Sequence, residues 1–233
     1  MAPRTKPPLE EPPVDERVHA AITSALLQGK LAPGAQLVER DLAAAFGCTR
    51  GTIRKVLTRL GFEGKVTLAA NRGAFVPSPS AHDIREVYRA RQLIEAGVVV
   101  ALCGSLTAQQ KRRLRAHVKS EERALKEGSV EDCVRLAGQF HLLLVELAGA
   151  AELQAFFAQL VAKTELYKAL FDPSKGSNCA SDEHSRLIEA LEAADLDAAL
   201  AAMREQLAEL EDRVLARADA KGGTDLVALF GGA

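Results

Sequence analysis

Residues 37–76 decide the fold of the N-terminal part of the chain, and they read LVERDLAAAFGCTRGTIRKVLTRLGFEGKVTLAANRGAFV. Two helical patterns lie in the first half of this stretch, separated by Gly47, where the first helix is expected to stop. Thr49 is suited to cap the second helix, because its hydroxyl can accept a hydrogen bond from a backbone amide of the first turn. The second helix has apolar residues at i, i+3, i+4 and i+7, which form one buried face: Ile53, Val56, Leu57 and Leu60. Arg50 and Arg54 lie four residues apart on a different side, so the helix presents two guanidinium groups outward.

A hairpin is predicted directly after these helices. Two short strand-like runs flank Asn71-Arg72-Gly73, and Gly73 supplies the backbone freedom that a tight turn needs. Upstream, apolar positions from Val14 onward recur at helical spacing until Gly29. The order of helix, helix-turn-helix and hairpin predicts a winged helix-turn-helix domain over residues 14–77.

This arrangement favours DNA binding. In a helix-turn-helix, the N-terminal residues of the second helix reach base edges in the major groove. Arginine suits this place because its fork can pair with guanine O6 and N7. Arg72 and Gly73 at the hairpin tip suit the minor groove or the phosphates. The alternative is that Arg50, Arg54 and Lys55 form an ordinary solvated helix face.

Charge and proline placement divide the chain in two. Residues 1–78 carry 11 Lys/Arg and 7 Asp/Glu, whereas residues 79–233 carry 19 and 24, so a basic unit precedes an acidic one. Residues 1–13 hold five of the nine prolines and are expected to form a disordered arm. Pro77 and Pro79 flank Ser78 and indicate a linker over residues 78–81. The net charge of −1 excludes a basic coat over the whole protein.

Two further features bear on the protein's location. No apolar run is long enough for a membrane span, and the N-terminus has no apolar signal segment. The four cysteines are spread without a CxxC pair, which indicates reduced thiols in a cytoplasmic protein.

A bundle of about six helices is predicted for residues 82–218. Proline is absent from 80 to 172, and helical patterns cover 82–103, 107–127, 129–148, 150–171, 180–193 and 195–218. The connections are short, so neighbouring helices are expected to be antiparallel. The whole chain is therefore expected to be mainly α-helical, with a flexible tail over residues 219–233 whose apolar residues are able to dock on a neighbour.

Four polar residues align with apolar faces of different bundle helices: Arg91, His141, His184 and Gln206. We expect them to converge in the bundle core as an effector-binding pocket. A buried arginine needs an anion, which either a protein carboxylate such as Glu95 or a carboxylate ligand would supply. Glu121-Glu122-Arg123, by contrast, is expected to form a solvated face.

The first domain resembles the DNA-binding domain of GntR-type bacterial transcription regulators. The resemblance is carried by Glu39-Arg40-Asp41-Leu42-Ala43, by residues 49–57 (TRGTIRKVL) and by Asn71-Arg72-Gly73. It implies DNA contacts by Arg40, Thr49, Arg50, Thr52 and Arg54, with Gly73 at the wing tip. Thr52 stands where the family often has proline. Lys55 stands where it often has glutamate, and can add a phosphate contact.

The second domain resembles the all-helical, FCD-type effector domain of the FadR-like branch of these regulators. YRARQLIEAGVVVAL (residues 88–102), QFHLLLVELAG (139–149) and EHSRLIEALEAADLDAALAAMREQL (183–207) carry this resemblance. Many such domains bind a divalent metal through one aspartate and three histidines. His141 and His184 match two of these positions, but Ala137 and Gln206 replace the other two ligands. The metal site is therefore expected to be incomplete, and no cofactor is expected to be required.

The leading hypothesis is a ligand-responsive transcription regulator, a repressor, that binds a palindromic operator as a homodimer and senses a small carboxylated metabolite. One alternative is a constitutive DNA-binding regulator with a vestigial sensor. Another is a metal-dependent enzyme in the bundle. A di-iron centre needs Glu-x-x-His pairs, but Gly138 and Ser181 stand three residues before His141 and His184, so no enzyme is expected.

Overall fold

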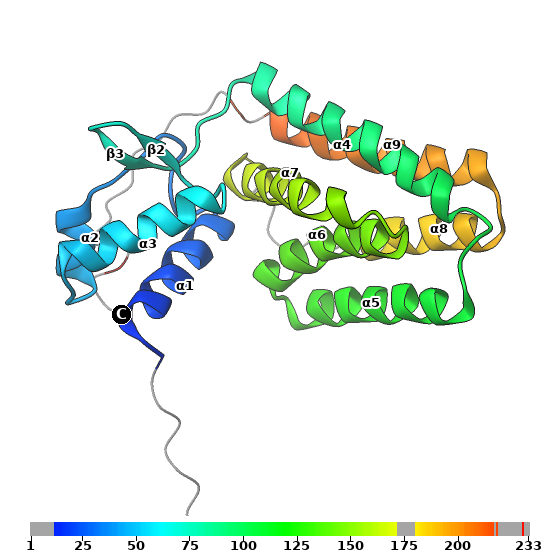
Figure 1. Cartoon of the computed structure of the whole chain (residues 1–233), viewed down its shortest axis with the longest axis horizontal. Helices are drawn as coiled ribbons and strands as arrows, with labels where there is room; N and C mark the ends of the chain where they lie inside the picture. Colours follow the sequence, from blue (N-terminus) through cyan, green and yellow to red (C-terminus); the bar gives the residue numbers. More distant parts are fainter. Residues whose placement is uncertain (1–11, 172–179, 217, 219–229, 231–233) are drawn as a thin grey trace, which may run out of the picture.

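A computed structural model describes residues 12–171, 180–216, 218 and 230 of the chain. Within these residues it contains nine helices and three short strands, in two units joined near residue 80 (Figure 1). The expected fold, mainly α-helical with a winged helix-turn-helix followed by a six-helix bundle, is confirmed. No helix in this part of the chain is long and apolar enough to cross a membrane.

The N-terminal unit packs three helices against a small sheet. Its elements are α1 (Val14–Leu27), β1 (Gln36–Leu37), α2 (Glu39–Ala45), α3 (Arg50–Phe62), β2 (Thr67–Ala69) and β3 (Gly73–Phe75). The four apolar residues expected on one face of α3 are all buried, beside Ile22 of α1 and Leu42 of α2. Thr49 caps α3 as expected, accepting a 3.1 Å hydrogen bond from the backbone amide of Thr52.

The sheet contains one strand more than the predicted hairpin. Its order is β1-β3-β2, and both pairings are antiparallel, with Gln36 opposite Phe75 and Thr67 on the other side of Phe75. A two-residue strand is too short to show an alternating pattern, so only its pairing with β3 defines it. Gly73 has a φ of +89°, a left-handed conformation in which glycine is free of the strain that a side chain would bring.

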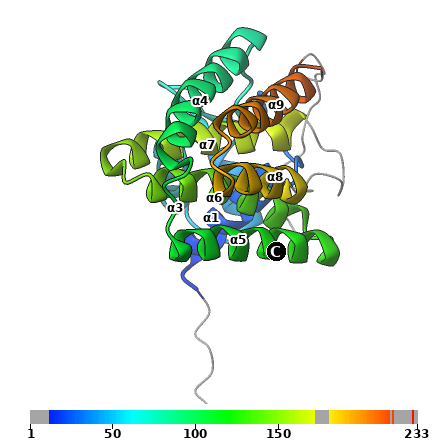
Figure 2. The same cartoon turned by 90° about the vertical axis from the view of Figure 1, so that its right-hand side faces the viewer.

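The C-terminal unit is the predicted bundle. Its helices are α4 (Ala81–Leu102), α5 (Ala108–Glu127), α6 (Val130–Leu147), α7 (Ala151–Phe171), α8 (Ser181–Glu192) and α9 (Leu196–Leu215). Four of them begin at a side-chain cap that accepts a hydrogen bond from the first turn: Ser80, Thr107, Ser129 and Asp195. Figure 2 looks along the bundle and shows α4 beside α9 on one side and α5 on the other. The last helix ends at Leu215, three residues before the expected limit.

The two units touch through α7. Its Leu166 is buried in the hydrophobic core of the N-terminal unit, and Leu170 packs against the same core. Ser24 of α1 also donates a 2.9 Å hydrogen bond to Glu131 at the start of α6. In Figure 1, α7 accordingly runs from the bundle toward α1 and α3.

Two expectations about the ends and the cysteines need revision. Phe230, expected in a flexible tail, is buried in the N-terminal core with its ring 5.2 Å from that of Phe46; the rest of residues 219–233 lies outside the described residues. Cys48 and Cys103 are free thiols, as expected, but Cys133 is disulfide-bonded, and Cys179 lies outside the described residues. The expectation of reduced thiols was therefore wrong for Cys133, because helical spacing does not reveal which distant cysteine the fold brings near.

Candidate DNA-binding surface and ligand cavity

The N-terminal end of α3 presents exposed cationic side chains. Arg50 and Arg54 are both exposed, and the guanidinium of Arg54 makes two hydrogen bonds to the carboxylate of Glu39, at 2.8 and 2.7 Å. The hydrogen bond from Arg54 lowers the pKa of Glu39, with a smaller contribution from the charges of Arg54 and Arg50. This contact holds Arg54 in one direction while its side chain remains 67% exposed.

The other expected contacts on the helix-turn-helix lie around this end. The hydroxyl of Thr52 is 3.0 Å from that of Thr49. Arg40 on α2 is exposed, and its Nε donates to Asp41 at 2.9 Å. Lys55 is also exposed, but its Nζ pairs with Asp15 of α1 at 2.8 Å. Lys55 thus contacts α1, whereas Arg54 contacts Glu39 of α2.

The tip of the wing is exposed and held in place by local contacts. The guanidinium of Arg72 lies 5.5 Å from the centre of the Phe75 ring, a cation–π distance. Gln36 of β1 donates a 2.9 Å hydrogen bond to the backbone carbonyl of Arg72. Strand β1, absent from the expected hairpin, therefore helps to fix the tip that carries Arg72 and Gly73.

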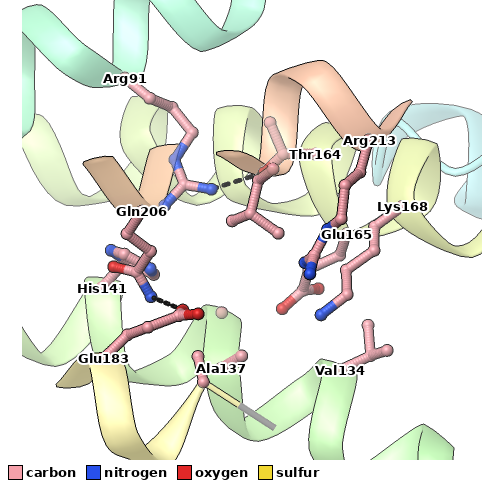
Figure 3. Close-up of a pocket in the computed structure, with 13 residues that line it drawn as sticks. Arg91, Val134, Ala137, His141, Thr164, Glu165, Lys168, Glu183, Gln206 and Arg213 are labelled. Carbon is pink, nitrogen blue, oxygen red and sulfur yellow. Dashed lines mark hydrogen bonds between the residues drawn. The ribbon is translucent and has the colours of Figure 1, made fainter. Parts of the chain in front are cut away.

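A cavity of about 60 Å³ lies inside the helical bundle (Figure 3). At about 10–15 Å³ for each water-sized site, this volume suits a ligand of only a few heavy atoms. Residues of α4, α6, α7, α8 and α9, together with Ala180 before α8, line it: Arg91, Val134, Ala137, Gly138, His141, Thr164, Glu165, Lys168, Ala180, Glu183, Gln206, Leu210 and Arg213. Three of the four expected effector residues, Arg91, His141 and Gln206, thus line one cavity.

Arg91 belongs to a buried polar chain at one wall of this cavity. Its Nε donates to Glu95 at 2.7 Å and its Nη1 donates to Thr164 at 2.8 Å, while the second oxygen of Glu95 accepts from Nδ1 of His141 at 2.5 Å. Nη2 of Arg91 is buried and has no hydrogen-bond partner among the described residues. The sequence allowed either a protein carboxylate or a ligand carboxylate as the partner of Arg91. The structure pairs Arg91 with the protein carboxylate of Glu95, and Arg91 retains one unpaired donor.

The ionisation states in this chain follow from burial and charge. Burial opposes ionisation of Glu95, but the charges of Arg91 and His141 and their hydrogen bonds outweigh it and lower the pKa of Glu95 to about 2. Burial also lowers the pKa of His141, so the imidazole is neutral at neutral pH. Because its Nδ1 donates to the carboxylate, Nε2 of the neutral ring is an acceptor.

His184, the fourth expected effector residue, does not line the cavity. Its ring stacks on Phe140 with centroids 3.8 Å apart, and its Nδ1 lies 2.9 Å from both carboxylate oxygens of Glu121. Burial lowers the pKa of His184 to about 4. The expectation that Glu121 is solvated was wrong: its side chain is fully buried, because α5 and α8 pack together and make it the partner of His184.

Helix α7 contributes cavity residues that the sequence did not reveal. Thr164, Glu165 and Lys168 come from this helix, whose apolar residues lie on all its sides because it packs between the two units. No apolar stripe therefore marked its inner face. The one available signal was the polar-rich run from Lys163 to Lys168, which interrupts a largely apolar helix.

Glu165 approaches the cavity over Gly138 of α6. A Cβ placed at position 138 would lie 1.5 Å from an oxygen of Glu165 and 2.9 Å from Cγ1 of Val161, so only glycine leaves room for this arrangement. Burial raises the pKa of Glu165 to about 7, against the opposing charges of Arg91 and Lys168. Glu165 is thus an acid that can be neutral or ionised near neutral pH.

The described residues do not form the metal site that the resemblance implied. Among them, no three His, Cys, Asp or Glu side chains are placed to share a cation. Nδ1 of His141 is taken by Glu95 and Nδ1 of His184 by Glu121, Ala137 has no ligand atom, and the guanidinium of Arg91 opposes a cation in the cavity. The residues present therefore do not fit a divalent metal.

Two family models match the chain. Residues 14–76 match the model for "Bacterial regulatory proteins, gntR family", and residues 86–209 match the FCD domain. These two segments correspond to the N-terminal unit and to most of the bundle.

Individual relatives agree with this division. The HTH-type transcriptional repressor RspR of Escherichia coli K12 is 24% identical over 203 residues, 87% of this chain and 89% of its own length. The Nta operon transcriptional regulator of Aminobacter aminovorans is 31% identical over 121 residues, 52% of this chain and 57% of its own length. Among solved structures, E. coli McbR/YncC has a TM-score of 0.65 at 20% identity, covering 87% of this chain and 99% of its own. A GntR-type regulator from Rhodococcus sp. RHA1 has a TM-score of 0.70 at 22% identity, covering 87% and 97%.

Proposed function

We propose a function on one premise: the chain belongs to the gntR family of bacterial transcriptional regulators and carries an FCD domain. The proposed function is that of a repressor in the bacterial cytoplasm that binds a palindromic operator as a homodimer and responds to a small carboxylated metabolite in the bundle cavity. The observation that carries it is the pairing of an exposed cationic helix end with a cationic cavity inside the FCD domain, joined by one helix.

The operator contacts that we propose are those of the helix-turn-helix and the wing. Arg50, Arg54 and Thr52 would meet base edges and phosphates from α3, and Arg40 and Thr49 would meet the adjacent backbone. Arg72 and Gly73 would follow the minor groove. Lys55 would reach a phosphate only by leaving Asp15. A dimer would place two α3 helices about 34 Å apart on one face of the operator.

The similarity to one relative supports repression as the mode of regulation. RspR, which aligns over 87% of this chain, is a transcriptional repressor. We propose that this chain also blocks transcription when bound to its operator. No catalytic step enters this proposal.

The proposed effector is a small carboxylate held by Arg91, with His141 and Gln206 beside it. The unpaired Nη2 of Arg91 supports this choice, because a buried guanidinium donor is best satisfied by an anion. His184 would act indirectly, by packing against His141 at a ring distance of 5.3 Å.

Helix α7 supports a route from the cavity to the DNA-binding unit. Thr164 and Glu165 face the cavity, while Leu166 on another side of the same turn is buried in the N-terminal core. A ligand that moves α7 would therefore also move α3. A coupling of about 1–3 kcal/mol would change operator affinity about 5- to 150-fold.

The test is fluorescence anisotropy of the full chain with labelled DNA from upstream of its own gene. We expect tight, sequence-dependent binding that Arg50→Ala abolishes and that Arg112→Ala, an exposed change on α5, leaves intact. A panel of small carboxylates is then expected to contain one that shifts the affinity. Equal binding to operator and scrambled DNA in low salt would contradict specific recognition. Specific binding that no acid changes would instead favour the constitutive regulator with a vestigial sensor.

A further inference from the structure

Glu165 is an ionisable group in the cavity that the proposed contacts leave unused. No described residue forms a hydrogen bond with its carboxyl group, although the side chain is half-buried and lies over Gly138. Figure 3 shows its carboxyl beside Lys168 and Arg213, across the cavity from Gln206 and His141. A carboxyl placed in this way will contact any ligand that enters.

Several cationic side chains face Glu165. The charged and titratable groups that face it come from each element packed against it: Lys65 after α3, Arg91 of α4, Arg135 and His141 of α6, Lys168 of α7, Glu183 of α8 and Arg213 of α9. His141 is neutral, and most of these cations are paired with acids of their own: Lys65 with Glu63, Arg91 with Glu95, Arg135 with Asp132 and Arg213 with Glu209. The buried Nη2 of Arg91, which has no hydrogen-bond partner among the described residues, therefore favours an anionic ligand.

An anionic ligand and an ionised Glu165 are poorly compatible in so small a space. Two carboxylates that share one site repel each other, and the usual solution is that one of them takes up a proton. A protonated carboxyl is also a hydrogen-bond donor, whereas an ionised one only accepts. The neutral His141 offers its Nε2 only as an acceptor, so it cannot donate a hydrogen bond to the carboxylate of the ligand.

We propose that Glu165 binds the effector as a neutral carboxylic acid, so that the cavity takes up a small carboxylate together with one proton. This inference rests on the proposed function, because it assumes a carboxylate effector. The proton comes from solvent, and it lies between an oxygen of Glu165 and the bound carboxylate. The protein thus responds to its ligand and to acidity at the same site.

Burial of Glu165 makes this step accessible near neutral pH. Its pKa is raised to about 7, so a substantial fraction of the free protein already carries the proton. If only the protonated form binds, affinity falls as pH rises through this value. Between about pH 6 and about pH 8 the expected loss is about tenfold.

Acetate is the probe for this proposal, because it is a small, stable carboxylate that fits the volume and stays ionised across this range. Its affinity for the full chain would be measured by calorimetry at both pH values and constant ionic strength. The wild type is expected to bind about tenfold more weakly at the higher pH. Calorimetry in two buffers of different ionisation enthalpy is expected to show uptake of about half a proton at about pH 7.

The variant Glu165→Gln tests whether protonation of Glu165 is what makes acetate binding depend on pH. The amide is neutral at every pH and keeps a donor, so the variant is expected to bind acetate with pH-independent affinity, close to that of the wild type at the lower pH. Glu211→Gln is the matched control: burial also raises the pKa of Glu211, but this residue does not line the cavity. It is expected to keep the pH dependence of the wild type.

Three outcomes would overturn the proposal. These are wild-type affinity that does not change with pH, the same pH dependence in Glu165→Gln as in the wild type, and no acetate binding at either pH. The proton-uptake measurement uses the wild type alone, so it decides the matter even if the variant does not fold. Operator binding is measured separately through Arg50→Ala, so failure of this inference leaves the DNA-binding part of the proposed function standing.

Discussion

Two arginine–glutamate pairs, one on each unit, have the same shortest N–O distance and very different surroundings. Arg54 and Glu39 meet at 2.7 Å with side chains that are 67% and 22% exposed. Arg91 and Glu95 meet at the same distance with side chains that are 4% and 1% exposed. Water screens the first pair and supplies alternatives for both partners, so its net contribution to stability is small and it can be exchanged for a phosphate. The second pair has no such alternative, so its members depend on each other.

The difference in exposure matches the two proposed tasks of the protein, DNA contact and ligand binding. The exposed pair orients a side chain that would contact DNA in the proposed complex. The buried pair, extended by His141 and Thr164, holds α4, α6 and α7 in register around the cavity. The same chemical groups are therefore available for the proposed DNA recognition where water surrounds them, and they stabilise helix packing where they are buried.

The largest expected effect comes from breaking the buried pair. Glu95→Gln leaves the guanidinium of Arg91 buried without its counter-ion, and we expect the free energy of unfolding to fall by about 3–5 kcal/mol. Urea denaturation followed by circular dichroism measures this change. Glu39→Gln, the corresponding change in the exposed pair, is the control and is expected to have little effect. Equal losses in the free energy of unfolding of both variants would mean that burial does not distinguish the two pairs.

A second test uses pH. His184 has a pKa of about 4 in the folded protein against 6.5 when unperturbed, so between these values the unfolded state binds more protons. Stability is therefore expected to fall as pH is lowered from about 6.5 to about 4, by on the order of 2–3 kcal/mol from this residue. His184→Gln keeps a donor for Glu121 but does not titrate, and it is expected to flatten the profile in this window. His82→Gln, at the exposed start of α4, should not. If His184→Gln leaves the dependence of stability on pH unchanged, the loss of stability in this window does not come from His184.

The smallest effect on stability, but a clear effect on binding, is expected from the exposed pair. Arg54→Ala should weaken operator binding about 5- to 150-fold, because an arginine that contacts bases or phosphates is lost, while the unfolding midpoint stays nearly unchanged. Arg59→Ala is matched to it: Arg59 is also exposed on α3 and paired with acids, Glu16 and Glu63, but lies at the far end of the helix. Anisotropy titrations that show equal losses for both variants would place the contact surface elsewhere.

The fold followed from local patterns because these patterns act at short range. The spacing of apolar residues, the caps at Thr49, Thr107 and Ser129, and the proline-free stretch set the helix limits to within a few residues. Strand β1 was missed because two residues carry no period. Arg91 was recognised as an inward-facing charge because it interrupts an apolar face of α4.

The sequence by itself thus determined the two-unit architecture, the exposed arginines of α3 and the inward direction of Arg91, His141, His184 and Gln206. Only the tertiary structure decided their partners. Glu95 meets His141 across 46 residues, Glu121 meets His184 across 63, and Arg91 meets Thr164 across 73. Helical periodicity states which face a side chain occupies, but the energy of a buried charge depends on what the opposite helix presents, and that is settled by packing over the whole bundle.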